Sequence, residues 1–296
     1  MREQRGVVAA PEMRAEMRLP DGRRLAWSEW GAEGGVPVLF CTGAAMSGWL
    51  GFGAGDLREL GMRLLAVDRP GLGRSDPHPA KTLRSWVEDV RALVKDGGLR
   101  DPLAVGFSQG APFAFALAGA GVVRALAVVS GQDQLSHPRL RPLLHPDVAG
   151  MVDAARRDPE EFERWFAGMA TPEGLWALVL GMSGERDRAL YGDAEFGAAY
   201  ERALREGFSQ GAGGYARDLV NALGPWPVEP EEVGVPVVLW YGALDTSTVH
   251  SPDHGATLAA RLPDASYTLD PEEGGSILWT RSRDILARLG ARAPGS

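Results

Sequence analysis

The sequence predicts an α/β fold, in which a mostly parallel sheet is flanked by helices and interrupted by a block of helices. Short apolar runs alternate with helical patterns over residues 36–130 and again over 235–289, an order that builds parallel sheets covered on both faces. Between Gln132 and Trp226 the helical patterns continue without a good strand. The expected bounds are 14–132 and 233–296 for the core, 133–232 for the helical insertion and 1–13 for a loose N-terminal tail.

The expected strands are short apolar runs bounded by turns. Residues 17–30 (MRLPDGRRLAWSEW) predict a hairpin, because the Asp-Gly dipeptide favours a tight turn between strands. The remaining strands are expected in the parallel part of the sheet, at Val36–Cys41, Leu64–Val67, Leu103–Phe107, Leu126–Ser130, Val235–Gly242 and Ser266–Leu269.

The expected helices follow from apolar spacing and capping residues. Leu83, Trp86, Val87 and Val90 recur at helical spacing, and Thr82 directly before them is a typical N-cap. Further helices of the core are expected near Asp56–Leu60, Gly110–Gly119, Ser251–Leu262 and Ile277–Leu289.

Composition excludes several classes of partner. The chain of 296 residues has a formal net charge of −8 and a pI near 5.3, whereas nucleic acids and anionic membrane surfaces attract basic proteins. The one cysteine, Cys41, excludes an intrachain disulfide and a thiolate metal cluster, and it is expected as a buried apolar thiol. No metal-ligand spacing or phosphate-binding glycine motif occurs. We expect no metal or cofactor, and a small molecule as the binding partner.

The sequence also indicates a cytoplasmic location. Its first residues lack the apolar stretch of a secretion signal. Two long segments, 34–55 and 102–123, carry no charge, but glycine, proline and serine interrupt both, so each is expected to form strand, turn and helix in a buried core.

The hexapeptide GFSQGA occurs twice, at 106–111 and at 207–212. Both copies fit G-x-S-x-G, the pattern of a nucleophile elbow, which is a sharp turn from a strand into a helix. The first copy follows the apolar run LAVGF and precedes a small-residue helix, so Ser108 is the expected nucleophile. The second copy follows an amphipathic helix, where Gly207 is expected as the glycine just past the helix end, and Ser209 is not expected to be reactive.

Three motifs in order make the chain resemble the α/β-hydrolase family over about residues 17–289. They are GFSQG at 106–110, VDRPGLGRSD at 67–76 and WYGALD at 240–245. The resemblance implies that the insertion is a helical cap and that a serine, an acid and a histidine follow one another along the chain. It implies Asp245 as the acid, with Asp133 as a fallback, and an oxyanion hole from the backbone N–H groups of Gln109 and Ala44.

The base departs from the family pattern. The family has its histidine in a Gly-His step after the last strand, where this chain reads LDPEEGGSILW, and the matching position is Gly275 or Ser276. No histidine follows His254, so the usual triad is incomplete. His250 is our first candidate for a displaced base and His254 the second, since both lie shortly after Asp245. Glu272 or Glu273 would need a pKa raised by burial to serve.

Three functions remain open at this stage. The first is a serine hydrolase that acts on a small, largely apolar ester or related carbonyl, with a displaced base. The second is a protein of the same fold that binds a small ligand without hydrolysing it, and the third is a lyase or isomerase in the same pocket. Aromatic side chains of the insertion should in part line an apolar pocket; they are Trp165, Phe166, Trp176, Phe196, Tyr200 and Phe208.

Overall fold

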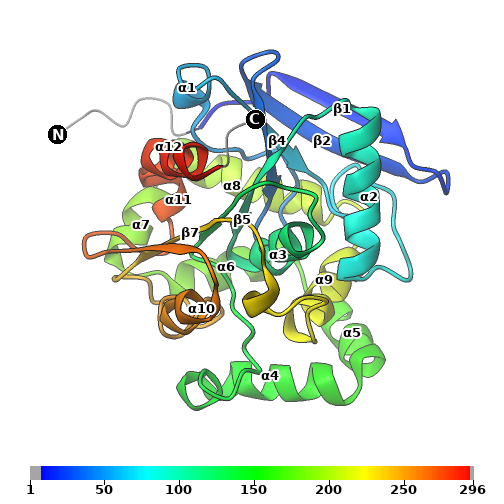
Figure 1. Ribbon diagram of the computed structural model, residues 1–296. Helices are drawn as coiled ribbons and strands as arrows, with labels where there is room; N and C mark the ends of the chain where they lie inside the picture. The colour runs from blue at the N-terminus through cyan, green and yellow to red at the C-terminus, as the bar shows by residue number, and fades with distance from the viewer. Residues whose placement is uncertain (1–7, 294–296) are drawn as a thin grey trace.

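The computed structural model describes residues 8–293 and contains one eight-stranded sheet in the order β1-β2-β4-β3-β5-β6-β7-β8 (Figure 1). Strands β1, β2 and β4 pair in antiparallel fashion, and every other neighbouring pair is parallel. The strands are β1 Met13–Arg18, β2 Arg24–Gly31, β3 Val36–Cys41, β4 Met62–Val67, β5 Leu103–Phe107, β6 Leu126–Val129, β7 Val237–Gly242 and β8 Ala265–Asp270. The predicted mostly parallel sheet and the N-terminal hairpin are therefore confirmed.

Helices follow most of the strands, as the sequence predicts. Those outside the β6–β7 connection are α1 Ala54–Leu57, α2 Leu83–Asp96, α3 Ala111–Gly119, α10 Ala256–Arg261, α11 Ile277–Thr280 and α12 Ser282–Arg292. Thr82 caps α2 as expected, in a reciprocal capping box with Ser85. Two expectations are wrong in detail. The last helix breaks at Arg281 into α11 and α12, and α10 begins at Ala256 rather than at Ser251.

The two faces of the sheet are covered by different helices because side chains alternate along a strand. On β3, Val38 and Phe40 belong to the apolar cluster that includes α1, α11 and α12. Leu39 and Cys41 belong to the opposite cluster, with α2, α3 and α10. Cys41 is buried as expected, and burial raises the pKa of its thiol to about 12. The two uncharged segments, 34–55 and 102–123, thus form strands and helices of the buried core, as expected.

Between β6 and β7 the chain forms helices and no strand. The principal helices are α4 Pro146–Arg157, α5 Pro159–Ala167, α6 Pro172–Met182, α7 Glu185–Tyr191, α8 Ala194–Gly207 and α9 Gly213–Leu223. We call residues 146–223 the α4–α9 segment; in Figure 1 its helices α4 and α5 lie at the bottom, away from α1 and α12. Among residues 8–293, no helix combines the length and apolar character that a bilayer span needs.

The expected N-terminal tail lies partly outside the described residues, which begin at Val8. Strand β1 starts at Met13, one residue before the expected core boundary. The carbonyl oxygen of Ala9 accepts a hydrogen bond from Trp30 Nε1 at 3.0 Å. Residues just before β1 are thus attached to the sheet.

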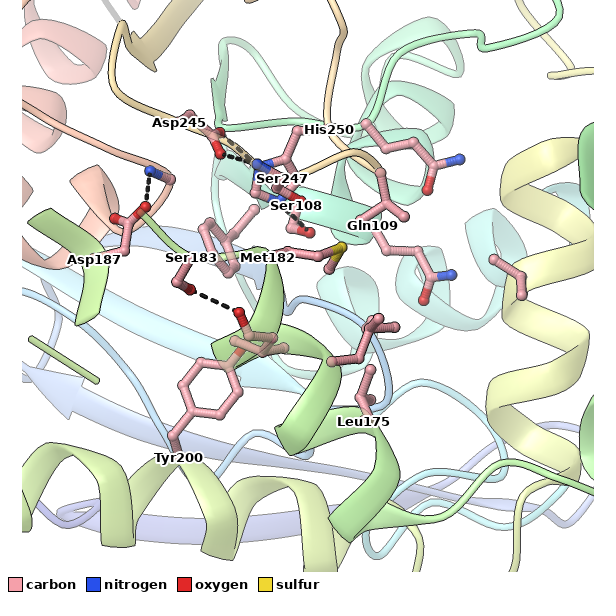
Figure 2. Close-up of a pocket in the computed structure, with 18 of the residues that line it drawn as sticks. Ser108, Gln109, Leu175, Met182, Ser183, Asp187, Tyr200, Asp245, Ser247 and His250 are labelled. Atoms are coloured by element: carbon pink, nitrogen blue, oxygen red, sulfur yellow. Dashed lines mark hydrogen bonds and ion pairs between the residues drawn. The ribbon is translucent and has the colours of Figure 1, made fainter. Parts of the chain in front are cut away.

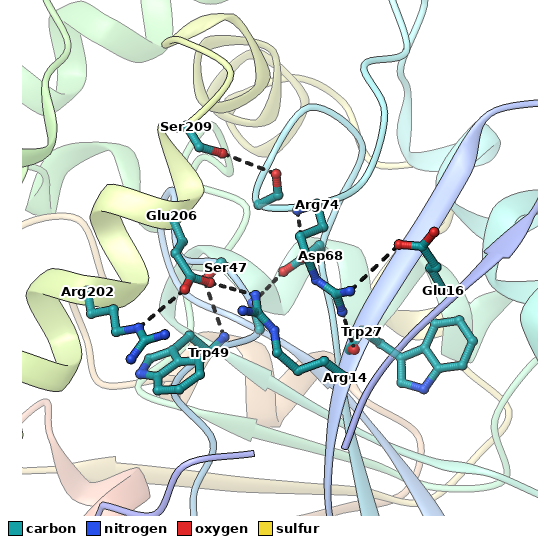
Figure 3. A network of polar contacts seen from close by, with 12 residues as sticks. Arg14, Glu16, Trp27, Ser47, Trp49, Asp68, Arg74, Arg202, Glu206 and Ser209 are labelled. Atoms are coloured by element: carbon teal, nitrogen blue, oxygen red, sulfur yellow. Dashed lines mark hydrogen bonds and ion pairs between the residues drawn. The ribbon is translucent and has the colours of Figure 1, made fainter. Parts of the chain in front are cut away.

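The second GFSQGA copy is part of a helix end and its loop. Gly207 is the last residue of α8 and Phe208 is the C-cap, so the expected position of Gly207 beyond the helix end is wrong. A Cβ on Gly207 would collide with the carbonyl oxygen of Ala45, which explains why glycine stands there. Ser209 Oγ donates to the Gly73 carbonyl at 3.2 Å, and Figure 3 shows it facing that loop.

Candidate active site

Ser108 lies in a strained turn between β5 and α3. Its φ of 50° is in the left-handed region that side chains rarely adopt, and such strain gathers at functional sites. The flanking glycines permit the turn. A Cβ on Gly106 would lie 2.8 Å from Ala111 Cα, and one on Gly110 would collide with the Cys41 carbonyl. The G-x-S-x-G pattern is therefore required by close packing of the strand, the helix and the β3 end.

A histidine and an aspartate meet Ser108 in one continuous chain of contacts (Figure 2). His250 Nε2 lies 2.9 Å from Ser108 Oγ, and His250 Nδ1 lies 2.7 Å from Asp245 Oδ2. The Asp245 carboxylate is 3% exposed and the His250 side chain 10%. A histidine thus contacts both groups although the loop after β8 has none.

The loop that carries Asp245 and His250 is fixed at both ends by backbone hydrogen bonds. Asp245 N donates to the Gly242 carbonyl at 3.2 Å, and Asp245 Oδ1 accepts from Ser247 N at 2.9 Å. Directly after His250, Ser251 N donates to the Gly131 carbonyl at 3.0 Å. The last bond joins the loop to the end of β6 and holds His250 above the neighbouring strand β5.

At Gly275 and Ser276, the positions that match the family's histidine, other groups already fill the space. A Cβ on Gly275 would lie 2.8 Å from Asp245 Oδ1. The backbone N–H groups of Gly275 and Ser276 donate to Asp187 at 3.0 and 2.8 Å, and Ser276 Oγ donates to it at 2.7 Å. Asp187 belongs to α7, so the α4–α9 segment closes this place. Sequence reasoning missed Asp187, since nothing near it in the sequence marks such a contact.

The structure does not bring the alternative candidates into contact with Ser108. His254 lies in the turn before α10, with a φ of 54°, and it does not line the cavity at Ser108. Asp133 is fully buried, but it accepts from Gln134 N and Ser251 Oγ rather than from His250. Glu273 is paired with Arg186 at 3.0 Å.

The two buried aspartates near the site have opposite pKa shifts. Burial alone would raise the pKa of Asp245, but His250 and the Ser247 N–H outweigh it, and the pKa lies below its ordinary value of 3.8. Asp245 therefore stays ionised at neutral pH. At Asp133 the hydrogen bonds from Gln134 and Ser251 do not offset the effect of burial, which raises the pKa of this carboxyl to about 6. Of the two, Asp245 is the one suited to stabilise a charged imidazole.

The expected oxyanion donors lie beside Ser108. Gln109 and Ala44 both line the cavity that contains Ser108. The Ala44 N–H donates to no group among residues 8–293, so it is available to a ligand. Arg69 holds the peptide that contains this N–H, because its Nη2 donates to the Gly43 carbonyl at 2.9 Å and its Nη1 to the Thr42 carbonyl at 2.7 Å.

Arg69 is part of a buried charge cluster that joins the core to α9. Its Nε lies 2.7 Å from Asp218 Oδ2, and Lys81 Nζ lies 2.6 Å from Asp218 Oδ1. All three side chains are at most 1% exposed. The guanidinium also lies 4.7 Å above the Phe113 ring. Asp218 lies 149 residues from Arg69 along the chain.

The cavity over Ser108 has a volume of about 120 Å³. A cavity of about 150 Å³ holds a benzene ring, so this space suits a group of about one small ring. Most of its wall is apolar and comes from the α4–α9 segment and the loop before His250; examples are Leu175, Val179, Met182, Leu219 and Val249.

The aromatic residues of the insertion divide between cavity and packing. Phe166 and Tyr200 line the cavity as expected. Trp165 is 54% exposed, and Trp176 stacks on Tyr200 with ring centroids 5.0 Å apart. Most of the aromatic cluster therefore supports the cavity wall rather than forming it.

Comparisons with known proteins agree with the fold. A family model described as "alpha/beta hydrolase fold" matches residues 36–282. A non-heme chloroperoxidase of Streptomyces lividans is 34% identical over 98 residues, which is 30% of this chain and 33% of that protein. The match thus spans about a third of the length of this curated relative.

Solved structures share the whole fold at low identity. A thermophilic esterase from Thermogutta terrifontis has a TM-score of 0.68 and 16% identity, covering 94% of this chain and 97% of its own. A bromoperoxidase from Bacillus anthracis has a TM-score of 0.69 and 17% identity, with 94% and 99% covered.

Proposed function

Since the chain belongs to the α/β-hydrolase fold family, we propose that it is a serine hydrolase that cleaves small, largely apolar esters. The observation that carries the proposal is the contact of His250 with both Ser108 and Asp245, at 2.9 and 2.7 Å. A serine hydroxyl needs such a base to become a nucleophile, and a base needs a third group to orient it.

The proposed first step forms an acyl-enzyme. With the Nδ1 proton held by Asp245, His250 Nε2 takes the proton of Ser108 Oγ as that oxygen attacks the ester carbonyl. The negative charge that develops on the carbonyl oxygen is stabilised by the N–H groups of Ala44 and Gln109. His250 then donates the proton to the departing alcohol, and Asp245 stabilises the transient imidazolium.

The proposed second step releases the acid. A water molecule gives a proton to His250 Nε2 and attacks the acyl carbonyl, and the Ser108–acyl bond breaks as His250 returns that proton to Ser108 Oγ. In this proposal the α4–α9 segment acts as the cap, because its side chains form most of the apolar wall over Ser108. Such a wall excludes bulk water and selects small acyl or alcohol groups.

A fluorophosphonate probe tests the nucleophile directly. We expect the probe to label the wild-type chain and Ser209→Ala, and to leave Ser108→Ala unlabelled. The wild-type protein should hydrolyse a panel of p-nitrophenyl esters of increasing acyl length, with a rate that declines for acyl groups larger than one ring. Ser108→Ala should not hydrolyse any ester of the panel. Absence of both labelling and turnover in the wild type would contradict the proposal and favour a ligand-binding function.

A further inference from the structure

Three of the five tyrosines in the sequence keep free hydroxyl groups inside the protein. Tyr241 Oη donates to the Gly131 carbonyl at 3.2 Å and Tyr267 Oη to the His254 carbonyl at 3.0 Å. Tyr191, Tyr200 and Tyr215 make no hydrogen bond with any residue that the structure describes. None of these three hydroxyl oxygens is fully enclosed by protein atoms, so each keeps room for a hydrogen-bond partner.

The three unpartnered tyrosines share one location. Each comes from a different helix, Tyr191 from α7, Tyr200 from α8 and Tyr215 from α9, and all three line the cavity that contains Ser108. They are 5–6% exposed. In Figure 2 the Tyr200 ring extends from its helix toward the space below Ser108. The three side chains therefore share the space over Ser108, and little of each is exposed.

Aromatic neighbours fix the three rings in place. The rings of Tyr191 and Tyr200 meet edge to face at 5.6 Å between centroids. Tyr215 packs in the same way against Phe166 at 5.1 Å and Phe208 at 5.7 Å. Rings held by such contacts present their hydroxyls in fixed positions, as recognition of a ligand requires.

The three hydroxyls are neutral donors. Burial raises the pKa of Tyr191, Tyr200 and Tyr215, and the neighbouring hydroxyls add to the effect, that of Tyr200 on Tyr191 and that of Tyr215 on Tyr200. Each phenol therefore keeps its proton at physiological pH. It can donate one hydrogen bond and accept another.

The charges of the cavity wall disfavour an anionic ligand. The wall contains two carboxylates, Asp187 and Asp245, and no lysine or arginine. Arg69 and Lys81 lie nearby, but both are paired with Asp218. A negatively charged substrate would enter a low-dielectric space beside two like charges, where repulsion is strong.

From these observations we infer that Tyr191, Tyr200 and Tyr215 form a recognition subsite for neutral oxygens of the substrate. The substrate class is an uncharged ester whose ring-sized acyl group carries a hydroxyl or keto oxygen. The inference rests on the proposed hydrolase function and adds its specificity. The apolar wall binds the ring, and the phenols pair with the oxygens that would otherwise lose water on entry.

Matched esters test the subsite. The probes are the p-nitrophenyl esters of cyclohexanecarboxylic acid and of its 3- and 4-hydroxy, 4-oxo and 4-carboxy derivatives. We expect at least one hydroxy or oxo ester to exceed the unsubstituted ester about tenfold in kcat/KM, as one or two hydrogen bonds would provide. The 4-carboxy ester should fall at least about tenfold below it, because of the two carboxylates.

Phenylalanine variants assign the effect to the hydroxyls. In Tyr191→Phe, Tyr200→Phe and Tyr215→Phe the ratio of kcat/KM for the oxygenated ester to kcat/KM for the unsubstituted ester should shrink at least threefold in one or more variants. Tyr267→Phe is the matched control, because its hydroxyl bonds to a carbonyl outside the cavity, and it should keep the full preference.

The fluorophosphonate reaction separates failure of this inference from failure of the hydrolase proposal. Wild-type protein that is labelled and hydrolyses all the esters at equal rates would overturn the subsite and leave the hydrolase standing. The same holds if the preference persists in all three variants. Wild-type protein that is neither labelled nor active would instead overturn the hydrolase itself.

Discussion

The buried charge cluster of Arg69, Asp218 and Lys81 predicts that two substitutions differ sharply in their cost. Asp218 carries the negative charge between two cations, at 2.7 Å from Arg69 and 2.6 Å from Lys81. Arg69→Met leaves the neutral pair of Lys81 and Asp218 intact. Asp218→Asn leaves two buried cations facing each other, so we expect it to be the more destabilising change.

The magnitudes follow from the number of broken pairs. Breaking one buried ion pair costs about 3–5 kcal/mol, and Asp218→Asn breaks two, so its loss should be about 6–10 kcal/mol. Arg69→Met breaks one pair and loses charged hydrogen bonds to Thr42 and Gly43 but retains packing on Phe113, and the expected loss is about 3–5 kcal/mol. Since domains are stable by about 5–15 kcal/mol, Asp218→Asn should leave the fold close to unfolding.

The same cluster should affect catalysis through Ala44. Arg69 holds the Gly43 carbonyl, which belongs to the peptide that provides the Ala44 N–H. Donors of an oxyanion hole act mainly in the transition state, so Arg69→Met should lower kcat about 10–100-fold and change KM little. Arg69→Lys keeps the charge but cannot span both carbonyls; it should be more stable than Arg69→Met and still show a lowered kcat.

Urea unfolding followed by tryptophan fluorescence measures the free energies of unfolding, and p-nitrophenyl ester kinetics measures kcat and KM. Equal destabilisation by Asp218→Asn and Arg69→Met would refute the electrostatic reasoning. Wild-type kcat in a folded Arg69→Met variant would refute the link between Arg69 and the Ala44 N–H.

Three further predictions concern the histidine, Asp133 and the second hexapeptide. His250→Gln should lower kcat about 10⁴-fold or more, whereas His254→Gln should keep wild-type kcat. Adding Gly275→His to His250→Gln should not restore kcat, because Asp245 occupies the space that a side chain at position 275 would need. Rescue of kcat by Gly275→His would contradict this account. The pKa of Asp133 is raised from 3.8 to about 6, so the folded state binds more protons than the unfolded state between these values, and stability falls as pH rises through them. Asp133→Asn should remove this loss of folding stability, which is about 2–3 kcal/mol. The urea midpoint of the variant should then change less with pH than that of the wild type. An unchanged slope would contradict the assigned pKa shift. Gly207→Ala should lower the urea midpoint by forcing α8 away from the Ala45 carbonyl, whereas an alanine tolerated at wild-type stability would show that this contact is loose.

Local signals along the chain account for the parts of the site that could be predicted. The strand Leu103–Phe107 was predicted with its observed bounds, because an apolar run between turn residues is a short-range pattern. Ser108 followed from the glycines around it, and the left-handed φ of 50° is what those glycines allow. Asp245 followed from its place after a strand.

Other parts of the site depend on contacts between distant segments. The pairing of His250 with Ser108 joins residues 142 positions apart, and it requires β5, β6 and β7 to lie side by side and the loop after β7 to return over β6. The sequence offered His250 and His254 four residues apart, and no local pattern distinguishes them. Asp187 and Asp218 come from helices whose docking no short-range signal reveals.

The sequence by itself determined the order of strands and helices, the elbow at Ser108 and the absence of a histidine after β8, because each depends on residues within about one turn or strand of one another. Only the tertiary structure decided which histidine meets Ser108, why Gly275 has no room for one, and which tyrosines keep free hydroxyls. The physical reason is that a hydrogen bond between distant residues is set by the packing of whole elements, and a shift of one ångström in that packing makes or breaks it.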